Sequence, residues 1–201
     1  MFVHLELNMK NIKTQSVMFL QGKRLYLRPV ERNDIPLLQK WINDPDVRKY
    51  LSNSFPLSLT DEEKYFERIS NSSKDNITLA VVRKKDDVML GSIGLHRIDY
   101  VNGIASTGSM YGRKSEWNKG YATEAKMILL EYAFMTLNLR KICSVAICDN
   151  IGSIKHNMNC GYKKEGISKS HCFRDGKYHD AVMLAVFKKD WKKVWKKNSK
   201  K

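Results

Sequence analysis

One stretch near the middle of the chain decides the fold: Trp117-Asn118-Lys119-Gly120-Tyr121-Ala122-Thr123-Glu124-Ala125. It lies between a predicted strand, Ala105 to Gly112, and a predicted helix, Tyr121 to about Leu137. Gly120 and Ala122 lack bulk, so a ligand can approach the backbone closely. The first N–H groups of a helix have no intrahelical partners and point outward at its positive end. We therefore predict an anion site, whose donors a diphosphate can satisfy and to which Lys119 adds charge, although an ordinary tight strand–helix connection would use the same residues.

The elements on either side of this stretch predict a mixed α/β domain. Ahead of it we expect strands at 24–28, 77–83, 88–97 and 105–112, and helices at 35–42 and 60–70, the second opened by a capping box at Thr60. Behind it we expect a strand at 141–148, a helix at 151–159, and strands at 162–165 and 181–187 around a polar loop that contains Arg174-Asp175-Gly176. The first half should be largely antiparallel and should join a β-α-β unit.

Length and composition agree with one globular domain. A chain of 201 residues suits a single core, and 42% apolar with 10% aromatic residues argues against disorder. No apolar run approaches the roughly 18 residues that span a bilayer. Residues 1–17 lack the uninterrupted apolar stretch of a signal peptide, so we expect a cytoplasmic protein. We expect an extension over 1–17, the domain over 18–191 and a lysine-rich tail over 192–201.

The cysteine and lysine patterns limit the possible ligands. Cysteines at 143, 148, 160 and 172 form no CxxC pair, and with the histidines they match no common zinc spacing, so we expect reduced thiols and no metal. Of the net charge of +15, the segment 188–201 carries +7, from eight lysines against Asp190. Such a run is either a solvated tail or a source of weak attraction to ribosomes or RNA.

The central stretch resembles the acetyl-CoA loop of the GCN5-related N-acetyltransferases (GNAT), Q/R-x-x-G-x-G/A. Gly120 and Ala122 fit the last two signature positions, and Trp117 stands where the superfamily often has Gln or Arg. The string is most similar to that of the Rim-type ribosomal-protein N-terminal acetyltransferases, W-G-K-G-Y-A-T-E-A. Asn118 departs from the first Gly of that string, a change that keeps the main-chain donors in place.

Further stretches resemble the same branch in the right order. They are Gly22–Pro29, Trp41–Val47, Asn150-x-x-Ser153 with Gly161–Gly166, and Asp175–Asp180 followed by Met183 and Asp190-Trp191. The resemblance therefore covers about residues 20–191. It implies a single GNAT-like domain, with a central mixed twisted sheet flanked by helices and two splayed strands that form the acetyl-CoA cleft.

The resemblance also implies the cofactor contacts. Acetyl-CoA would be the cosubstrate, and no metal is implied. The expected contacts are Met110, Tyr111 and Gly112 at the end of a splayed strand, Trp117, Asn118, Lys119, Gly120, Tyr121, Ala122 and Thr123 in the loop, and Asn150 and Ser153 beside the cofactor arm. A turn and a helix N-cap are the structural alternatives for Asn150 and Ser153.

The resemblance identifies the catalytic groups less directly than the cofactor contacts. Many GNAT enzymes place a Tyr acid on the second helix, and by resemblance that position holds Asn157 here. Either Asn157 orients a water, or Ser153 or solvent protonates the departing thiolate. The candidates for a general base are His96, Asp99, Tyr111 and His179; His96 lies on a predicted strand and has a pKa suited to the work.

Three functions remain open from the sequence. The leading one is transfer of acetyl from acetyl-CoA to a primary amine, with a ribosomal-protein N-terminus as the acceptor. The second is acetylation of a small amine such as a polyamine, an aminoglycoside or an amino sugar. The third is a non-catalytic module that binds CoA, or binds RNA through the basic tail.

Overall fold

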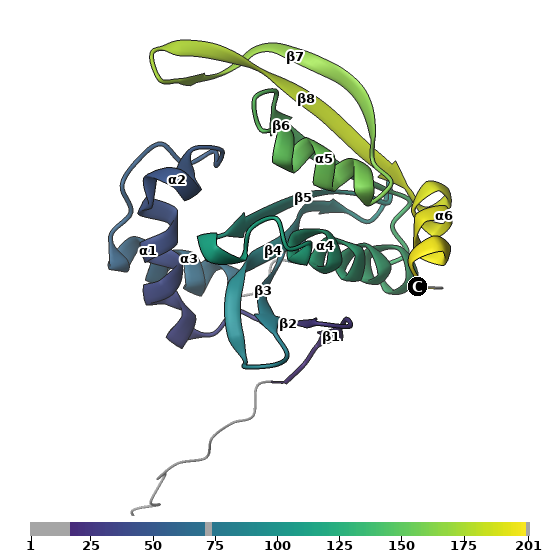
Figure 1. Cartoon of the computed structure of the whole chain (residues 1–201), viewed down its shortest axis with the longest axis horizontal. Coiled ribbons are helices and arrows are strands. Elements are labelled where there is room, and N and C mark those ends of the chain that lie inside the picture. The colour runs from purple at the N-terminus through teal and green to yellow at the C-terminus, as the bar shows by residue number, and fades with distance from the viewer. Residues whose placement is uncertain (1–16, 71–73, 200–201) are drawn as a thin grey trace, which may run out of the picture.

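The computed structural model describes residues 17–70 and 74–199 (Figure 1). The strands are β1 (Leu20–Gln21), β2 (Leu25–Pro29), β3 (Ile77–Arg83), β4 (Val88–Asp99), β5 (Ile104–Tyr111), β6 (Lys141–Ile147), β7 (Lys163–Arg174) and β8 (Lys177–Phe187). The helices are α1 (Ile35–Asn43), α2 (Pro45–Arg48), α3 (Leu59–Ser70), α4 (Tyr121–Glu131), α5 (Ile151–Asn159) and α6 (Lys188–Ser199). Short 3-10 turns precede α1 and α4, and a π-helical turn, Tyr132–Thr136, follows α4.

The strands of the described chain form one mixed sheet in the order β1-β2-β3-β4-β5-β6-β8-β7. Neighbouring strands are antiparallel except β5 and β6, which run parallel. These two pair only where Ile104–Ser106 faces Lys141–Cys143. Beyond that point β5 remains paired with β4 and β6 with β8, so the two strands part. We call the resulting gap in the ladder the β5–β6 opening; it confirms the expected splayed strands.

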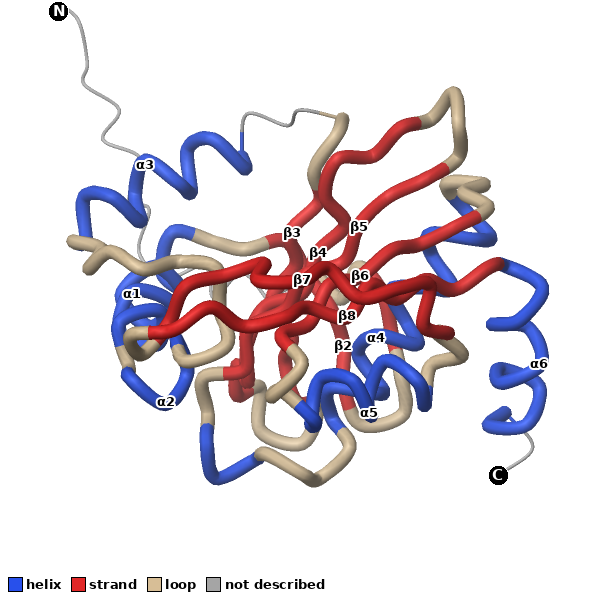
Figure 2. Tube along the Cα trace, turned by 90° about the horizontal axis from the view of Figure 1, so that it is seen from above, coloured by secondary structure: helices blue, strands red, loops and turns tan. Residues whose placement is uncertain are grey.

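Helices cover both faces of the sheet, with α1–α3 gathered on one side and α4 and α5 on the other (Figure 2). Alternation along the strands sends side chains to two cores. The larger core lies against α4 and α5 and includes Ile93, Leu129 and Phe134. The smaller one lies against α1 and includes Tyr26 and Trp41. The β5–β6 opening therefore lies in a sheet that is packed on both faces.

Helix α1 is docked on the end of β5 through a glycine. Trp41 is 6% exposed, and its indole lies directly against Gly112. A Cβ atom built on Gly112 would come within 1.9 Å of the Trp41 ring. Since no flexible side-chain end is involved, only a residue without a Cβ lets the ring and the strand approach this closely.

Two predicted boundaries were wrong for reasons of local chemistry. Helix α3 begins at Leu59 because Ser58 and Asp61 cap each other, with the Asp61 N–H donating to Ser58 Oγ at 3.2 Å, rather than through a box at Thr60. The expected polar loop between the last two strands is a β-hairpin, in which β7 and β8 continue to a two-residue turn. Asp175 and Gly176 make that turn with φ of 49° and 78°, the left-handed pair of a type I′ hairpin.

The lysine-rich segment lies in α6, so the expected domain limit after Trp191 falls inside a helix. Trp191 is 2% exposed and packs its ring 5.4 Å from that of Phe134 and 5.2 Å from that of Trp195. Val194 also contacts the main core. Apart from Val17, the expected N-terminal extension lies outside the described residues.

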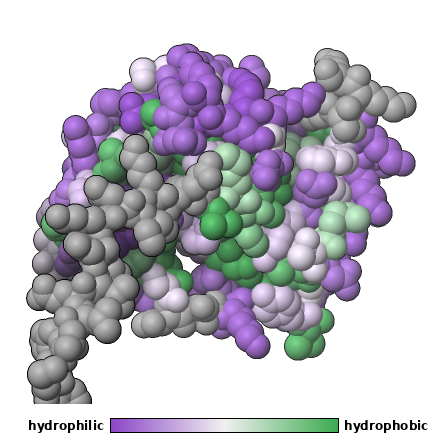
Figure 3. All heavy atoms as spheres, turned by 90° about the horizontal axis from the view of Figure 1, so that it is seen from below, coloured by the Kyte–Doolittle hydropathy of each residue, from purple (hydrophilic) through white to green (hydrophobic). Residues whose placement is uncertain are grey.

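The surface is mostly hydrophilic around an apolar area in the face seen in Figure 3. Within residues 17–70 and 74–199, no helix is long and apolar enough to cross a membrane. In the same residues, no three His, Cys, Asp or Glu side chains gather closely enough to hold a metal ion.

Candidate active site

The end of β5 presents main-chain groups to the β5–β6 opening. A Cβ on Gly91 of β4 would lie 2.1 Å from the Met110 carbonyl oxygen, so that carbonyl faces β4 and not the opening. Because successive residues of a strand present their main-chain groups to opposite sides, those of Ser109 and Tyr111 face the other way. The Tyr111 carbonyl accepts a hydrogen bond from Trp117 Nε1 at 2.8 Å. Trp117 thereby ties the loop before α4 to the open edge of β5.

The loop leading into α4 has the backbone of an anion cradle. Asn118 and Gly120 both have positive φ, 62° and 80°, and Gly120 is the N-cap of α4. No side chain of the described residues caps this helix, so the first-turn N–H groups of Tyr121, Ala122 and Thr123 point outward unpaired. A Cβ on Gly120 would approach only the end of the Arg24 side chain, at 3.5 Å. The space beside these donors is therefore open to a ligand.

Arg24 of the β1–β2 turn braces this loop. Its Nε pairs with Glu124 Oε2 at 2.7 Å, and its Nη1 donates to the Lys119 carbonyl at 3.0 Å. Its guanidinium also lies 4.5 Å from the centre of the Tyr121 ring. Sequence reasoning missed this role, because the alternating pattern around Arg24 indicates a strand and contains no signal for a contact 100 residues away.

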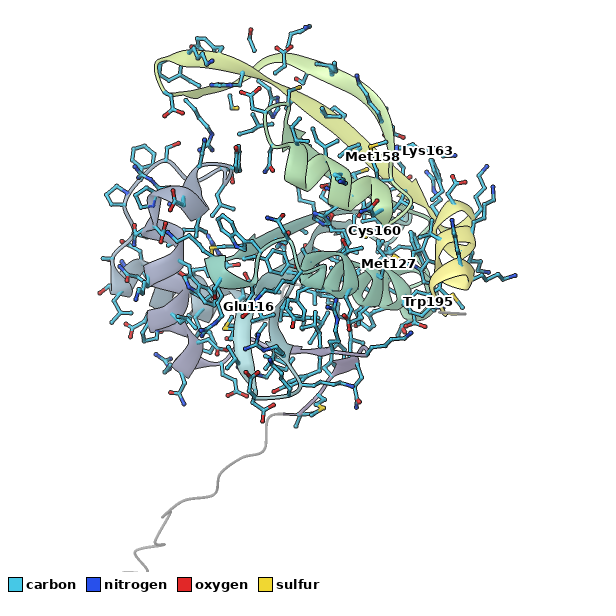
Figure 4. The ribbon with its side chains drawn as sticks, in the orientation of Figure 1. Glu116, Met127, Met158, Cys160, Lys163 and Trp195 are labelled. Atoms are coloured by element: carbon cyan, nitrogen blue, oxygen red, sulfur yellow. The ribbon has the colours of Figure 1, made fainter. Side chains whose placement is uncertain are left out.

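Lys119 shares its charge with an acidic neighbour. Its Nζ lies 3.1 Å from Glu116 Oε2, and Arg83 Nη1 lies 3.0 Å from the other oxygen of the same carboxylate. Hydrogen bonds from Lys119 and Arg83 hold the pKa of Glu116 below its ordinary value. Figure 4 labels Glu116 in this region. Glu116 therefore balances part of the charge that Lys119 would offer an anion, while the main-chain donors of the loop have no such competitor.

Helix α5 carries the polar residues that were predicted to lie beside the cofactor arm and the departing thiolate. Asn150 Oδ1 accepts from the Ser153 N–H at 2.9 Å, which makes Asn150 the N-cap of α5. Asn157 is fully buried, and its Nδ2 donates to the Ser153 carbonyl at 2.8 Å. Its Oδ1 accepts from Lys126 Nζ of α4 at 2.8 Å. Cys160, just after α5, donates through Sγ to the Thr123 carbonyl at 3.7 Å, which joins the end of α5 to the first turn of α4 (Figure 4).

Three of the four base candidates are poorly placed to accept a proton, because their side chains either already form hydrogen bonds or are buried. Asp99 accepts from the Asn102 backbone and side chain in a turn. The Tyr111 hydroxyl is buried and has no hydrogen-bond partner in the part of the chain that the structure describes, and burial raises its pKa. His179 Nδ1 lies 2.8 Å from Asp149 Oδ2 and Nε2 lies 3.3 Å from the Arg174 carbonyl, so both ring nitrogens are occupied.

His96 differs from those three. Its ring lies across the glycine pair of β4 and β5, with Nε2 3.3 Å from where a Cβ on Gly108 would be. It is partly exposed, and burial together with the charge of Arg97 lowers its pKa below the ordinary value. Along β4 it is one residue out of phase with Ile93 and Leu95 of the main core, so it lies on the sheet face opposite α4 and α5.

The sequence matches the acetyltransferase (GNAT) domain family over residues 24–163, which span the sheet from β2 through α5. The chain belongs to this GNAT family. Among its relatives, the uncharacterized N-acetyltransferase p20 of Bacillus licheniformis is 29% identical over 174 residues, covering 86% of this chain and 97% of that protein. The putative ribosomal N-acetyltransferase YdaF of Bacillus subtilis is 33% identical over 109 residues, covering 53% and 57%.

A solved structure agrees with this GNAT fold. The chain resembles a spermidine N-acetyltransferase from Vibrio cholerae, crystallised with CoA and spermine, at a TM-score of 0.79 and 21% identity, covering 85% of this chain and 99% of that one. The protein is thus an acetyl-CoA-dependent N-acetyltransferase, an enzyme rather than a silent module. The residues present fit the cosubstrate, because the uncapped α4 N-terminus offers donors to a diphosphate and the β5–β6 opening leaves strand groups unpaired.

Proposed function

We propose that this GNAT enzyme acetylates the α-amino group at a protein N-terminus, with ribosomal proteins as the leading acceptors in the manner of the Rim-type branch. The observation that carries the proposal is His96, the one base candidate whose ring nitrogens have no hydrogen bond among the described residues. Burial and Arg97 lower its pKa, so it is neutral but weakly basic at pH 7. Such a base suits an acceptor amine that needs little help to lose its proton.

The two classes of acceptor differ in that need. A free α-amino group has a pKa near 8, whereas an alkyl ammonium such as a lysine side chain has one near 10.4. Producing the neutral amine at pH 7 therefore costs roughly 3 kcal/mol more for the alkyl ammonium. A weak base beside the acceptor favours the α-amino group by this margin.

The charges near the open ends of β5 and β6 also argue against a polycation. Lys114 Nζ forms ion pairs with Asp44 Oδ2 at 3.1 Å and with Asp46 Oδ2 at 2.6 Å, just after the Trp41–Gly112 contact in the chain. Asp149, just after β6, pairs with His179, and Asp180 of β8 pairs with Lys169 at 2.8 Å. A polyamine needs free carboxylates, and each of these four already has a hydrogen-bond or ion-pair partner.

A small amine is the second candidate acceptor. It is favoured by the fold shared with a spermidine N-acetyltransferase and by the acidic run Asp61-Glu62-Glu63 at the start of α3. Glu62 is buried, so its carboxylate is not presented to an incoming polycation, and burial raises its pKa. This is why we place the small amine second.

A parallel assay of acceptors tests the proposal. The enzyme is given acetyl-CoA and, in separate reactions, a peptide with a free N-terminus, the same peptide with a blocked N-terminus and an internal lysine, spermidine, an aminoglycoside and an amino sugar. Release of the CoA thiol gives kcat/KM for each. We expect the free N-terminal peptide to exceed every other acceptor by at least tenfold, about 1.4 kcal/mol. Faster turnover of spermidine would contradict the proposal and support the second candidate.

We also propose that the main-chain N–H groups of 118–123 bind the diphosphate of acetyl-CoA. Gly120→Val is expected to weaken CoA binding at least tenfold, about 1.4 kcal/mol, measured by calorimetry. A valine is disfavoured at φ 80°, and its Cβ would occupy space beside the donors. Gly176→Val is the matched control, because Gly176 has a similar φ of 78° and open space around it, but lies in the β7–β8 turn. Equal CoA affinity in the two folded variants would show that the diphosphate does not bind this loop.

A further inference from the structure

A lysine is buried between the two helices that flank the proposed cofactor site. Lys126 of α4 is 2% exposed. Its Nζ donates to Asn157 Oδ1 at 2.8 Å and to Thr107 Oγ1 at 3.2 Å, and lies 5.2 Å from the centre of the Tyr162 ring. Over residues 17–70 and 74–199 we find no carboxylate paired with it. Burying an ammonium without a counter-charge costs free energy, so packing alone does not explain a lysine at this position.

The ammonium decides which way the Asn157 amide points. A lysine ammonium has three donors and no acceptor, so it must face the oxygen of the amide and not its NH2 group. Asn157 Nδ2 is thereby turned toward Ser153, 2.8 Å from the carbonyl and 3.4 Å from Oγ. Reversing the amide would set NH2 against ammonium inside a buried site. Lys126 therefore fixes Asn157 in one of two otherwise similar orientations.

The orientation of Asn157 in turn sets the role of the Ser153 hydroxyl. A hydroxyl that accepts from Asn157 Nδ2 keeps its own proton for another acceptor. Ser153 lies in the first turn of α5, and that helix follows β6, the strand on the far side of the β5–β6 opening. The row from Lys126 through Asn157 to Ser153 therefore runs from the buried side of α4 toward the opening.

We propose that Lys126 is a positioning residue for acetyl transfer, which acts through Asn157 to leave the Ser153 hydroxyl as a hydrogen-bond donor to the sulfur of the cosubstrate. The inference rests on the proposed function. In that reaction the C–N bond forms, the C–S bond breaks and its electron pair passes to sulfur. The amine releases one proton to His96, which passes it to solvent, and sulfur takes one up from solvent, so the protons balance. Ser153 stabilises the charge on sulfur without losing its own proton.

Among the titratable groups of this cluster, Lys126 is the one whose pKa lies near neutral pH. Burial lowers the pKa of Lys126 to about 8. Cys160, beside the end of α5, has its pKa raised by burial to about 12, and burial lowers that of His156 to about 3. Burial also raises the pKa of Tyr162 and of Tyr111 on β5. All four are neutral between pH 6 and 9, while Lys126 loses its charge above about pH 8.

Lys126→Met, which keeps the length and removes the charge, is the test. We expect kcat to fall at least tenfold, while KM for acetyl-CoA and the thermal stabilisation by CoA stay within twofold and 1 °C of wild type. The wild-type kcat should decline above about pH 8, and the variant should lack that decline. Adding Asn157→Leu to Lys126→Met should cause little further loss, because the two residues act as a unit. Lys155→Met, at an exposed lysine of α5, is the matched control and should retain wild-type kcat.

A second readout does not depend on turnover. The side-chain amide signals of Asn157, assigned by their loss in Asn157→Leu, should shift in the NMR spectrum of Lys126→Met and not in that of Lys155→Met. Unchanged kcat and pH profile in Lys126→Met, or unchanged Asn157 signals, would overturn the inference. Failure of CoA to stabilise the wild type would instead refute the cofactor placement, and the Asn157 signals would still decide the contact with Lys126.

Discussion

Replacing Gly112 with alanine is expected to lower the free energy of unfolding by about 3 kcal/mol, the upper part of the range for overpacked sites. The added Cβ would lie 1.9 Å from the Trp41 indole, well inside van der Waals contact. Trp41 is buried in the smaller core and cannot rotate away without leaving it. Either α1 moves off the sheet or the end of β5 shifts, and both cost packing. Urea denaturation, with the change in midpoint read at constant slope, measures the loss.

Two companion variants separate this clash from the general effect of a methyl group. Gly166→Ala in β7 adds the same Cβ where no atom lies within 4 Å, and should change stability by less than about 0.5 kcal/mol. Trp41→Leu makes room at the contact, so Gly112→Ala should cost less in that background than alone. If Gly112→Ala is as stable as wild type, the close docking of α1 on β5 is not the packing of the folded protein.

The stability of the protein should depend on pH through Lys126. Its pKa is about 8 in the folded chain against 10.5 for the ordinary side chain, so between these values the unfolded state binds more protons. Stability then rises with pH across that window, and below about pH 8 the lysine lowers stability by a constant amount. Relative to Lys126→Met, the wild type should gain about 3 kcal/mol between pH 7 and 10.5.

The comparison with the methionine variant isolates this contribution. Cys160 has a raised pKa and lowers stability as pH rises above about 9, but it is present in both proteins. Loss of the hydrogen bond to Asn157 Oδ1 offsets part of the benefit of methionine, by about 1–3 kcal/mol, without depending on pH. Parallel curves of unfolding free energy against pH for the two proteins would show that Lys126 keeps its ordinary pKa and is not buried as described.

Local signals were enough for much of the fold. The limits of α5, 151–159, were predicted correctly because Asn150 caps its start and Gly161 lies just past its end at φ 91°. The hairpin of β7 and β8 was missed, although Asp175-Gly176 is a strong turn signal. Its flanking strands are rich in Lys, Ser and His, and most of β7 is exposed, so the apolar alternation that indicates a strand is weak there.

The site was predictable where its chemistry depends on backbone near in sequence. Gly120 at the N-cap of α4 follows from a glycine before a helix, and the structure gives it the left-handed φ that the residue allows. The placement of Lys126 could not be predicted, because Ala125 and Leu129 around it indicate only a buried helix face. Its partners Thr107 and Asn157 come from another strand and another helix, 19 and 31 residues away. Contacts of this kind leave no periodic trace in a single sequence.

The strand pairings also differ in the length of chain that each one closes, and the short β5–β6 pairing closes a long connection. β3, β4 and β5 follow one another through turns at 84–87 and 100–103, so their pairings cost little chain entropy. β6 reaches β5 only after residues 112–140, and it gains three residue pairs in return. The β3-β4-β5 part of the sheet thus forms through short turns and is joined to β6 by a long closure. The β5–β6 opening lies at this long closure, so assembling the site costs more chain entropy than forming the β3-β4-β5 turns.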